Sequence, residues 1–222
     1  MKPTTLQVRQ ESQFLKRIRN VLFICGVLSS ILYVSTDIFA AMMWRGYSYA
    51  AQSVSELMAI GAPTRSLVVL LFTFYNVLII AFGIGVWASL NPKWTLRITG
   101  ILLIGYGIVG QLALLFFPMH LRGGVKTISD TMHATLTMLI VIIILLFIGF
   151  GAAAHKRQFR LYSIITIIIM MLFGVLAGMD GPRVAAHLPT PWLGVMERIN
   201  IYTSMLWVMV LALKLLRTKK LS

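Results

Sequence analysis

Residues 132–154 read MHATLTMLIVIIILLFIGFGAAA, an apolar run of 23 residues without a charged side chain. A helix rises about 1.5 Å per residue, so this run is long enough to cross the roughly 30 Å hydrocarbon core of a bilayer. A strand of a membrane barrel would instead alternate polar and apolar residues over about ten positions. The run therefore predicts a transmembrane helix.

The same criterion predicts six transmembrane helices, at residues 21–43, 67–90, 96–117, 132–154, 161–179 and 191–216. Of the 222 residues, 59% are hydrophobic and only 12% are charged, which argues against a water-soluble domain. No Gly/Ser-rich or Pro-rich linker divides the chain. The predicted fold is therefore all-α, a single six-helix membrane domain at 21–216 between basic tails at 1–20 and 217–222.

The net charge of +14 is distributed unevenly. The two tails and the connections after the second and fourth helices together carry +13, whereas the other three connections carry only +2. By the positive-inside rule, both termini are expected to be cytoplasmic, in the inner membrane of a bacterial cell. Membrane lipids are the expected partners. The basic residues lie beside membrane spans, so they do not indicate nucleic-acid binding.

Asp37 is the most unusual residue of the first predicted helix. A carboxylate inside a span costs up to about 3 kcal/mol, so it should face the interior of the bundle. Ser30 and Tyr33 recur with it at helical spacing and form one polar stripe. Two interpretations stand, a functional carboxylate and a structural one that is paired with a neighbouring helix.

Other polar residues are expected at a similar depth. Counted inward along the predicted helices, Asn76, Gln111 and Asn200 lie within about 8–15 Å of the outer surface, as Asp37 does. With His133 and the outer Arg183, they could line one outward-facing polar cavity. Each amide alone could equally be a hydrogen bond between helices.

Glu56 lies in the longest outer loop. Ser53 and Glu56 have the spacing of a capping box, which predicts a short helix here that would lie over the bundle as a lid. Glu56 also remains a candidate catalytic acid, together with Asp37 and His133.

A metal site is a further hypothesis. Asp130 and His133 are three residues apart at the start of the fourth helix, and Asp180 and His187 lie in the last outer loop. Carboxylates and imidazoles are the ligands of zinc-like ions, although no HExxH motif is present. Both aspartates could instead cap helices. No cofactor is identified beyond this possible divalent metal.

The loop SVSELMAIGAPTR at residues 53–65, the Phe-Pro pair at 117–118 and His133 at the start of a helix resemble an uncharacterised bacterial family. This is the family of integral membrane proteins grouped as domain of unknown function 998. The resemblance implies a six-helix membrane fold and carries no activity.

Two functions follow as hypotheses. The first is a membrane protein of unknown activity whose outward-facing cavity binds a lipid or a small amphipathic ligand. The alternative is an intramembrane hydrolase at the outer face, with or without a metal, in which Asp130, His133, Asp180 and His187 activate water. The sequence leaves open whether the protein is an enzyme.

Overall fold

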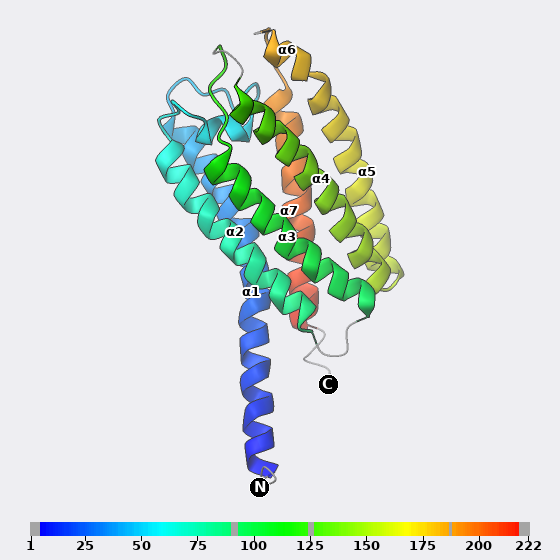
Figure 1. Ribbon diagram of the computed structural model, residues 1–222. Helices are drawn as coiled ribbons and strands as arrows, with labels where there is room; N and C mark the ends of the chain where they lie inside the picture. Colours follow the sequence, from blue (N-terminus) through cyan, green and yellow to red (C-terminus); the bar gives the residue numbers. More distant parts are fainter. Residues whose placement is uncertain (1–4, 90–92, 124–126, 187, 218–222) are drawn as a thin grey trace.

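The computed structural model describes residues 5–89, 93–123, 127–186 and 188–217. Figure 1 shows an all-helical chain whose two termini extend from the same end of the bundle. Within the described residues, six helices are long and apolar enough to cross a membrane. The predicted fold class and number of spans are therefore confirmed.

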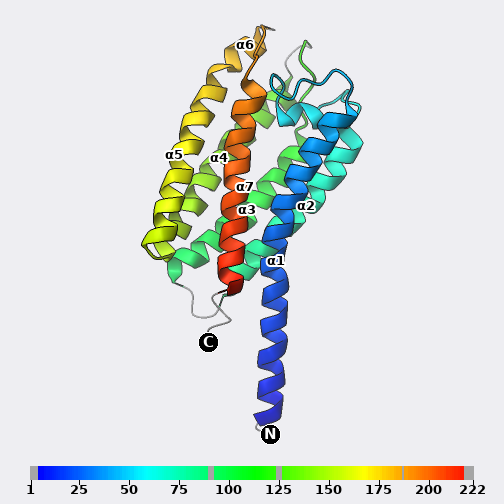
Figure 2. The ribbon, with the colours of Figure 1, turned by 180° about the vertical axis from the view of Figure 1, so that it is seen from behind.

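The elements follow one another along the chain as seven α-helices and one short 3-10 helix: α1 (Thr5–Met43), η1 (Val54–Met58), α2 (Arg65–Trp87), α3 (Trp94–Phe116), α4 (Ile128–Ala154), α5 (Arg157–Met179), α6 (Gly181–Ala185) and α7 (Leu193–Arg217). The six long helices form a closed ring. Each packs on its neighbours in the order α1, α2, α3, α4, α5, α7, and α7 returns to α1 (Figure 1 and Figure 2). We call the end with the chain termini the terminal end and the opposite end the lid end.

Helix α1 begins much earlier than the apolar run suggested. The prediction placed residues 1–20 in a tail, whereas the helix starts at Thr5 and projects beyond the bundle (Figure 1). The segment from residue 5 to 20 is rich in Leu, Gln, Glu, Lys and Arg, which favour helix without being apolar enough to register as a span. Residues 218–222 of the predicted C-terminal tail lie outside the described residues.

The terminal half of the ring is filled by aromatic rings. Trp207 of α7 is completely buried, with its ring 5.5 Å from that of Phe147 and 5.6 Å from that of Phe159. Its indole Nε1 donates to Ser163 Oγ at 2.8 Å, so the polar end of the ring is satisfied. Gly151 leaves room for the indole, because a Cβ there would lie 2.6 Å from Trp207. One large side chain thus joins α4, α5 and α7.

The lid end is built differently. Residues 44–64, which we call the lid, run from α1 to α2 and include η1 (Figure 1). The short helix begins with the predicted capping box. This prediction is confirmed, since the Ser53 backbone N–H donates to Glu56 Oε1 at 3.0 Å. Val54 and Leu57 are fully buried against α1 and α2, so the lid is packed onto the bundle. The lid covers the region in which the polar residues of the spans gather.

Candidate functional site

Asp37 and Arg198 form a buried ion pair between α1 and α7. Arg198 Nε donates to Asp37 Oδ2 at 2.8 Å and Nη2 donates to Oδ1 at 2.9 Å, a bidentate arrangement. The Asp37 side chain is completely buried and that of Arg198 is 4% exposed. The hydroxyls of Tyr49 and Tyr202 also donate to Asp37 Oδ2. Both carboxylate oxygens are therefore hydrogen-bonded to protein groups, Oδ2 to three donors and Oδ1 to one.

The same arginine holds the lid. Its Nη1 donates to the carbonyls of Tyr49 and Gln52, and its guanidinium stacks 3.7 Å above the Tyr49 ring. Its Nη2 also donates to the Tyr47 hydroxyl. Burial raises the pKa of both Tyr47 and Tyr49, which keeps their hydroxyls protonated as donors. Arg198 of α7 thus binds the lid, through its backbone and two of its tyrosines, and also binds α1 through Asp37.

The start of α7 is shaped to receive the lid. A Cβ at Gly194 would lie 2.4 Å from the carbonyl oxygen of Gln52 and 2.5 Å from that of Tyr49, so only glycine permits this approach. One turn further on, Glu197 Oε2 accepts the backbone N–H of Val54 at 2.8 Å. Residues 194, 197 and 198 lie on one face of the helix, and that face binds the lid.

A second ion pair fixes the other side of the lid. Arg122, in the connection between α3 and α4, donates through Nε and Nη2 to Glu56 Oε1 at 2.9 and 2.7 Å. It also donates to the Ala51 carbonyl and to Thr190 Oγ1. Glu56 is 2% exposed, and its other oxygen accepts from Gln52. Glu56 is therefore engaged as a helix cap and an ion-pair partner.

Beneath the lid is a cavity of about 380 Å³. It lies in the lid half of the ring and is lined by residues of all six long helices. Its walls are mainly apolar or small, and include Phe72, Leu114, Ile140, Ile144, Ala177 and Ile201. Ser53, Ser55 and Met58 of the lid close it. A pocket of this size and lining is typical of a site for a small, partly apolar molecule.

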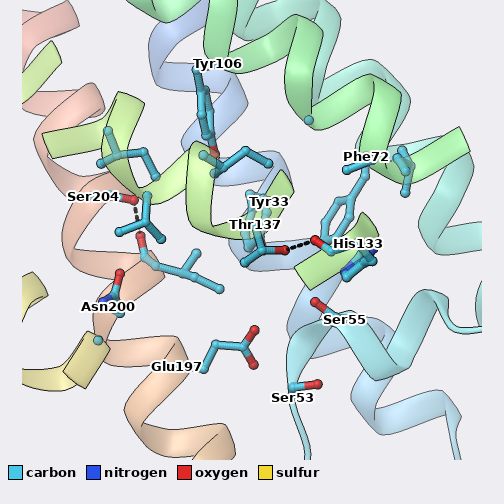
Figure 3. Close-up of a pocket in the computed structure, with 18 of the residues that line it drawn as sticks. Tyr33, Ser53, Ser55, Phe72, Tyr106, His133, Thr137, Glu197, Asn200 and Ser204 are labelled. Carbon is cyan, nitrogen blue, oxygen red and sulfur yellow. Dashed lines mark hydrogen bonds between the residues drawn. The ribbon is translucent and has the colours of Figure 1, made fainter. Parts of the chain in front are cut away.

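A few polar groups line this cavity. Figure 3 shows the Glu197 carboxyl pointing into it, with Asn200 on the same helix and with Ser55 and His133 on the other side. His133 Nδ1 donates to the Phe117 carbonyl at 2.9 Å, so in the neutral ring Nε2 is the nitrogen that accepts. Asn200 Nδ2 donates to the Met170 carbonyl at 2.8 Å.

Three of the six residues expected to line a cavity do line it in the structure. Asn76, His133 and Asn200 line it. Gln111 lies beside it, where its Oε1 accepts from Asn76 Nδ2 and its Nε2 donates to Thr73. Asp37 is instead paired with Arg198, and the exposed Arg183 donates to the Pro189 carbonyl near α6.

The proposed metal ligands have other partners. Asp130 closes a capping box with Thr127 and accepts from the backbone N–H of His120 at 2.7 Å. Asp180 precedes α6 and lies 3.7 Å from Arg183. Among the described residues no three His, Cys, Asp or Glu side chains are grouped as a metal site. His187 lies outside the described residues, so the four-ligand metal hypothesis stays a prediction.

Sequence reasoning missed three charged residues that organise the site. These are Arg198 and Glu197, near the outer end of the last predicted helix, and Arg122, in an outer connection. A signal for the first was available: Arg198 lies about as far inside the last predicted helix as Asp37 does inside the first, with opposite charge. A cation and an anion at the same depth predict an ion pair, because each alone would be costly in the membrane.

Comparison with known families gives a match over residues 27–214, to the family described as "Protein of unknown function (DUF998)". The match extends from α1 to α7 and includes the lid and every residue that lines the cavity. No curated protein and no solved structure matches the chain.

Proposed function

Because the chain belongs to the DUF998 family, whose description assigns no activity, we propose its function from the site alone. The protein is a multi-pass membrane protein that binds a lipid or another small amphipathic molecule in the cavity beneath the lid. The observation that carries this proposal is a cavity of about 380 Å³ with mostly apolar walls and a few buried polar groups.

The contrast with the packed terminal half supports this function. Protein interiors are normally close-packed, and an unfilled hollow forfeits contacts among its lining atoms. The lid half nevertheless holds a hollow open under a lid that two ion pairs fix in place. A bound amphiphile would supply the missing contacts, with its apolar part against Phe72 and Ile144 and its polar part near Glu197 and Ser55.

The charge pattern supports an orientation for this site. With the termini cytoplasmic, the lid faces the outside of the cell membrane, and the cavity takes its ligand from the outer leaflet or from the external solution. A fluorescent protein fused to the C-terminus should then fold and fluoresce in the cytoplasm. A fusion that is active only on the external side would overturn this orientation without affecting the binding proposal.

The binding proposal is tested by filling the cavity. Ala177 of α5 lines it, and Ala177→Phe should place a ring in the hollow. Leu172→Phe is the matched control, because Leu172 is on the same helix but is 55% exposed. Native mass spectrometry of the purified full-length protein should show a lipid or other amphiphile retained by the wild type and by the control, and lost in Ala177→Phe. Equal retention in all three proteins would overturn the proposal.

A further inference from the structure

Several polar groups of the cavity already donate a hydrogen bond to the protein. His133 Nδ1, Asn76 Nδ2 and Asn200 Nδ2 each donate to a protein oxygen, at 2.9, 2.9 and 2.8 Å. The hydroxyls of Ser204 and Thr137 donate to backbone carbonyls of their own helices. These five donors are therefore directed to the protein.

Four acceptor atoms of the lining remain unpaired, beside the second N–H of each of the two amides and the hydroxyls of Ser55 and Tyr33. Glu197 Oε1, His133 Nε2 and the Oδ1 atoms of Asn76 and Asn200 have no hydrogen-bond partner in the part of the chain that the structure describes. All four atoms are acceptors, apart from a proton that Glu197 can carry. The three uncharged residues among them are more than nine-tenths buried. A ligand that satisfies them must bring donors.

The charge of the cavity also favours a positively charged ligand. Glu197 is the one charged side chain in its described lining, which includes neither Lys nor Arg. The nearby arginines are already engaged, Arg198 with Asp37 and Arg122 with Glu56. The walls also hold the rings of Tyr33 and Phe72, stacked with their centroids 4.5 Å apart, and aromatic faces attract cations. A phosphate or carboxylate would find no counter-ion here.

From this inventory we propose that the ligand of the cavity is a cationic amphiphile, an apolar chain or ring system that carries a protonated primary amine. The amine donates to Glu197 Oε1 and to the neighbouring free acceptors, and the apolar part lies along α4 and α5. This inference rests on the proposed function, because it names the chemical class of ligand for the same cavity.

The test uses probes with one chain and different head groups. Dodecylamine, dodecanol, dodecanoate and dodecyltrimethylammonium are titrated, below their critical micelle concentrations, into the full-length protein in a non-ionic detergent. Isothermal titration calorimetry should show dodecylamine as the tightest probe and dodecanoate as the weakest. Dodecyltrimethylammonium should bind more weakly than dodecylamine, because it has the charge without N–H donors.

Glu197→Gln is the decisive variant. The Gln side chain keeps an acceptor oxygen for the Val54 N–H, so the lid contact survives while the charge is lost. The variant should lose about ten- to hundredfold in affinity for dodecylamine, the range of a hydrogen bond to a charged group, and little for dodecanol. Asp180→Asn is the matched control. It removes one negative charge at the same end of the molecule but outside the cavity, and it should leave both affinities unchanged.

Ser55→Ala provides a second variant that leaves the fold intact, since no partner of the Ser55 hydroxyl occurs among the described residues. It should weaken dodecylamine binding less than Glu197→Gln does. The outcomes separate the two proposals. Binding of dodecanol and dodecanoate that matches dodecylamine, and that Ala177→Phe abolishes, would overturn the amine inference and leave amphiphile binding standing. Binding of every probe that Ala177→Phe leaves unchanged would overturn both.

Discussion

The two halves of the helix ring are held together by different means. In the terminal half, Trp207 fills the centre and contacts Phe147, Phe159 and Gly151. In the lid half, a cavity lies at the centre and the strongest contacts lie around it, as ion pairs between the lid and the helices. The terminal half is thus stabilised by close packing, whereas in the lid half charged hydrogen bonds add to the apolar packing of Val54 and Leu57.

This difference teaches how one bundle can be both rigid and hollow. Close packing of Trp207 at the terminal end fixes the relative positions of α4, α5 and α7. The ion pairs then replace the packing that the cavity removes. A polar clamp is suited to this position because its hydrogen bonds fix the lid without filling the space beneath it.

The largest expected effect comes from breaking the Asp37–Arg198 ion pair. Arg198→Met leaves the Asp37 carboxylate buried without its counter-ion, and loss of one partner of such a pair costs about 3–5 kcal/mol in the free energy of unfolding. Unfolding of the purified protein by titration with a denaturing detergent measures the effect. Arg183→Met is the control, because Arg183 is half-exposed and should matter little.

The double variant Asp37→Leu with Arg198→Met sharpens this prediction. Removing both charges leaves neither one unpaired, so much of the stability should return. Lid contacts made by Arg198 would still be lost, so trypsin should cut the lid of the double variant, at Arg45 for example, faster than in the wild type. A double variant as unstable as Arg198→Met would show that the charge pair is not what the single variant disrupts.

The next effect is specific to the terminal half. Gly151→Ala places a Cβ 2.6 Å from the Trp207 ring, and forcing extra volume into a packed core costs about 1–3 kcal/mol. Gly149→Ala is the matched control on the same helix, because its Cβ meets no atom within 4 Å among the described residues. Ala177→Leu, which adds more volume but in the cavity, should cost less than Gly151→Ala. The reverse order would contradict the distinction between a packed half and a hollow half.

The fold was largely predictable because hydropathy acts over whole helices. A run such as residues 132–154 has one stable arrangement in a bilayer, and the helix α4 that contains it begins only four residues earlier, at Ile128. The start of α1 was not predictable from the same signal, because residues 5–20 are helical without being apolar. The capping box of Ser53 and Glu56 was readable because its partners are three residues apart.

The site was predictable only in part, for a physical reason. Depth along a helix can be counted from the sequence, and this placed Asn76 and Asn200 at the level where the cavity lies. The direction in which a side chain points, and its partner in another helix, depend on the rotation of each helix in the ring. Asp37 could therefore be placed in depth, whereas local spacing gives no indication of its pairing with Arg198, 161 residues away, which only the matching depth of the two charges indicates.

A smaller loss of stability is expected when a single hydrogen bond is removed in either half. Ser163→Ala removes the acceptor of the buried Trp207 Nε1–H, which should cost about 1–3 kcal/mol in the free energy of unfolding. Gln111→Leu removes its contacts with Asn76 and Thr73, and bonds of this kind between membrane helices average about 0.6 kcal/mol. Denaturing-detergent titrations of both variants make the comparison. A greater loss for Gln111→Leu would place the more important hydrogen bonds in the lid half.

The smallest effect is a pH dependence at the terminal end. His155 lies between α4 and α5, its Nδ1 bonded to the Gly151 carbonyl at 2.8 Å and its ring 4.6 Å from that of Phe159. Burial, reinforced by the positive charges of Lys214 and Lys93, lowers the pKa of His155 in the folded protein. Protonation of His155 is therefore less favourable in the folded state than in the unfolded chain, where the pKa of the imidazole is about 6.5. His155 therefore leaves the free energy of unfolding unchanged above about pH 6.5 and lowers it as the pH decreases below that value.

His155→Asn isolates this contribution, since an amide can donate to the Gly151 carbonyl but does not titrate. Between pH 7.5 and 5.5 the wild type should lose more thermal stability than the variant, while groups elsewhere in the chain affect both proteins alike. Parallel losses would mean that the connection between α4 and α5 opens enough to hydrate the imidazole. The terminal half would then be tightly packed around Trp207 but not at its edge, and the contrast between the two halves would be confined to the centre of the ring.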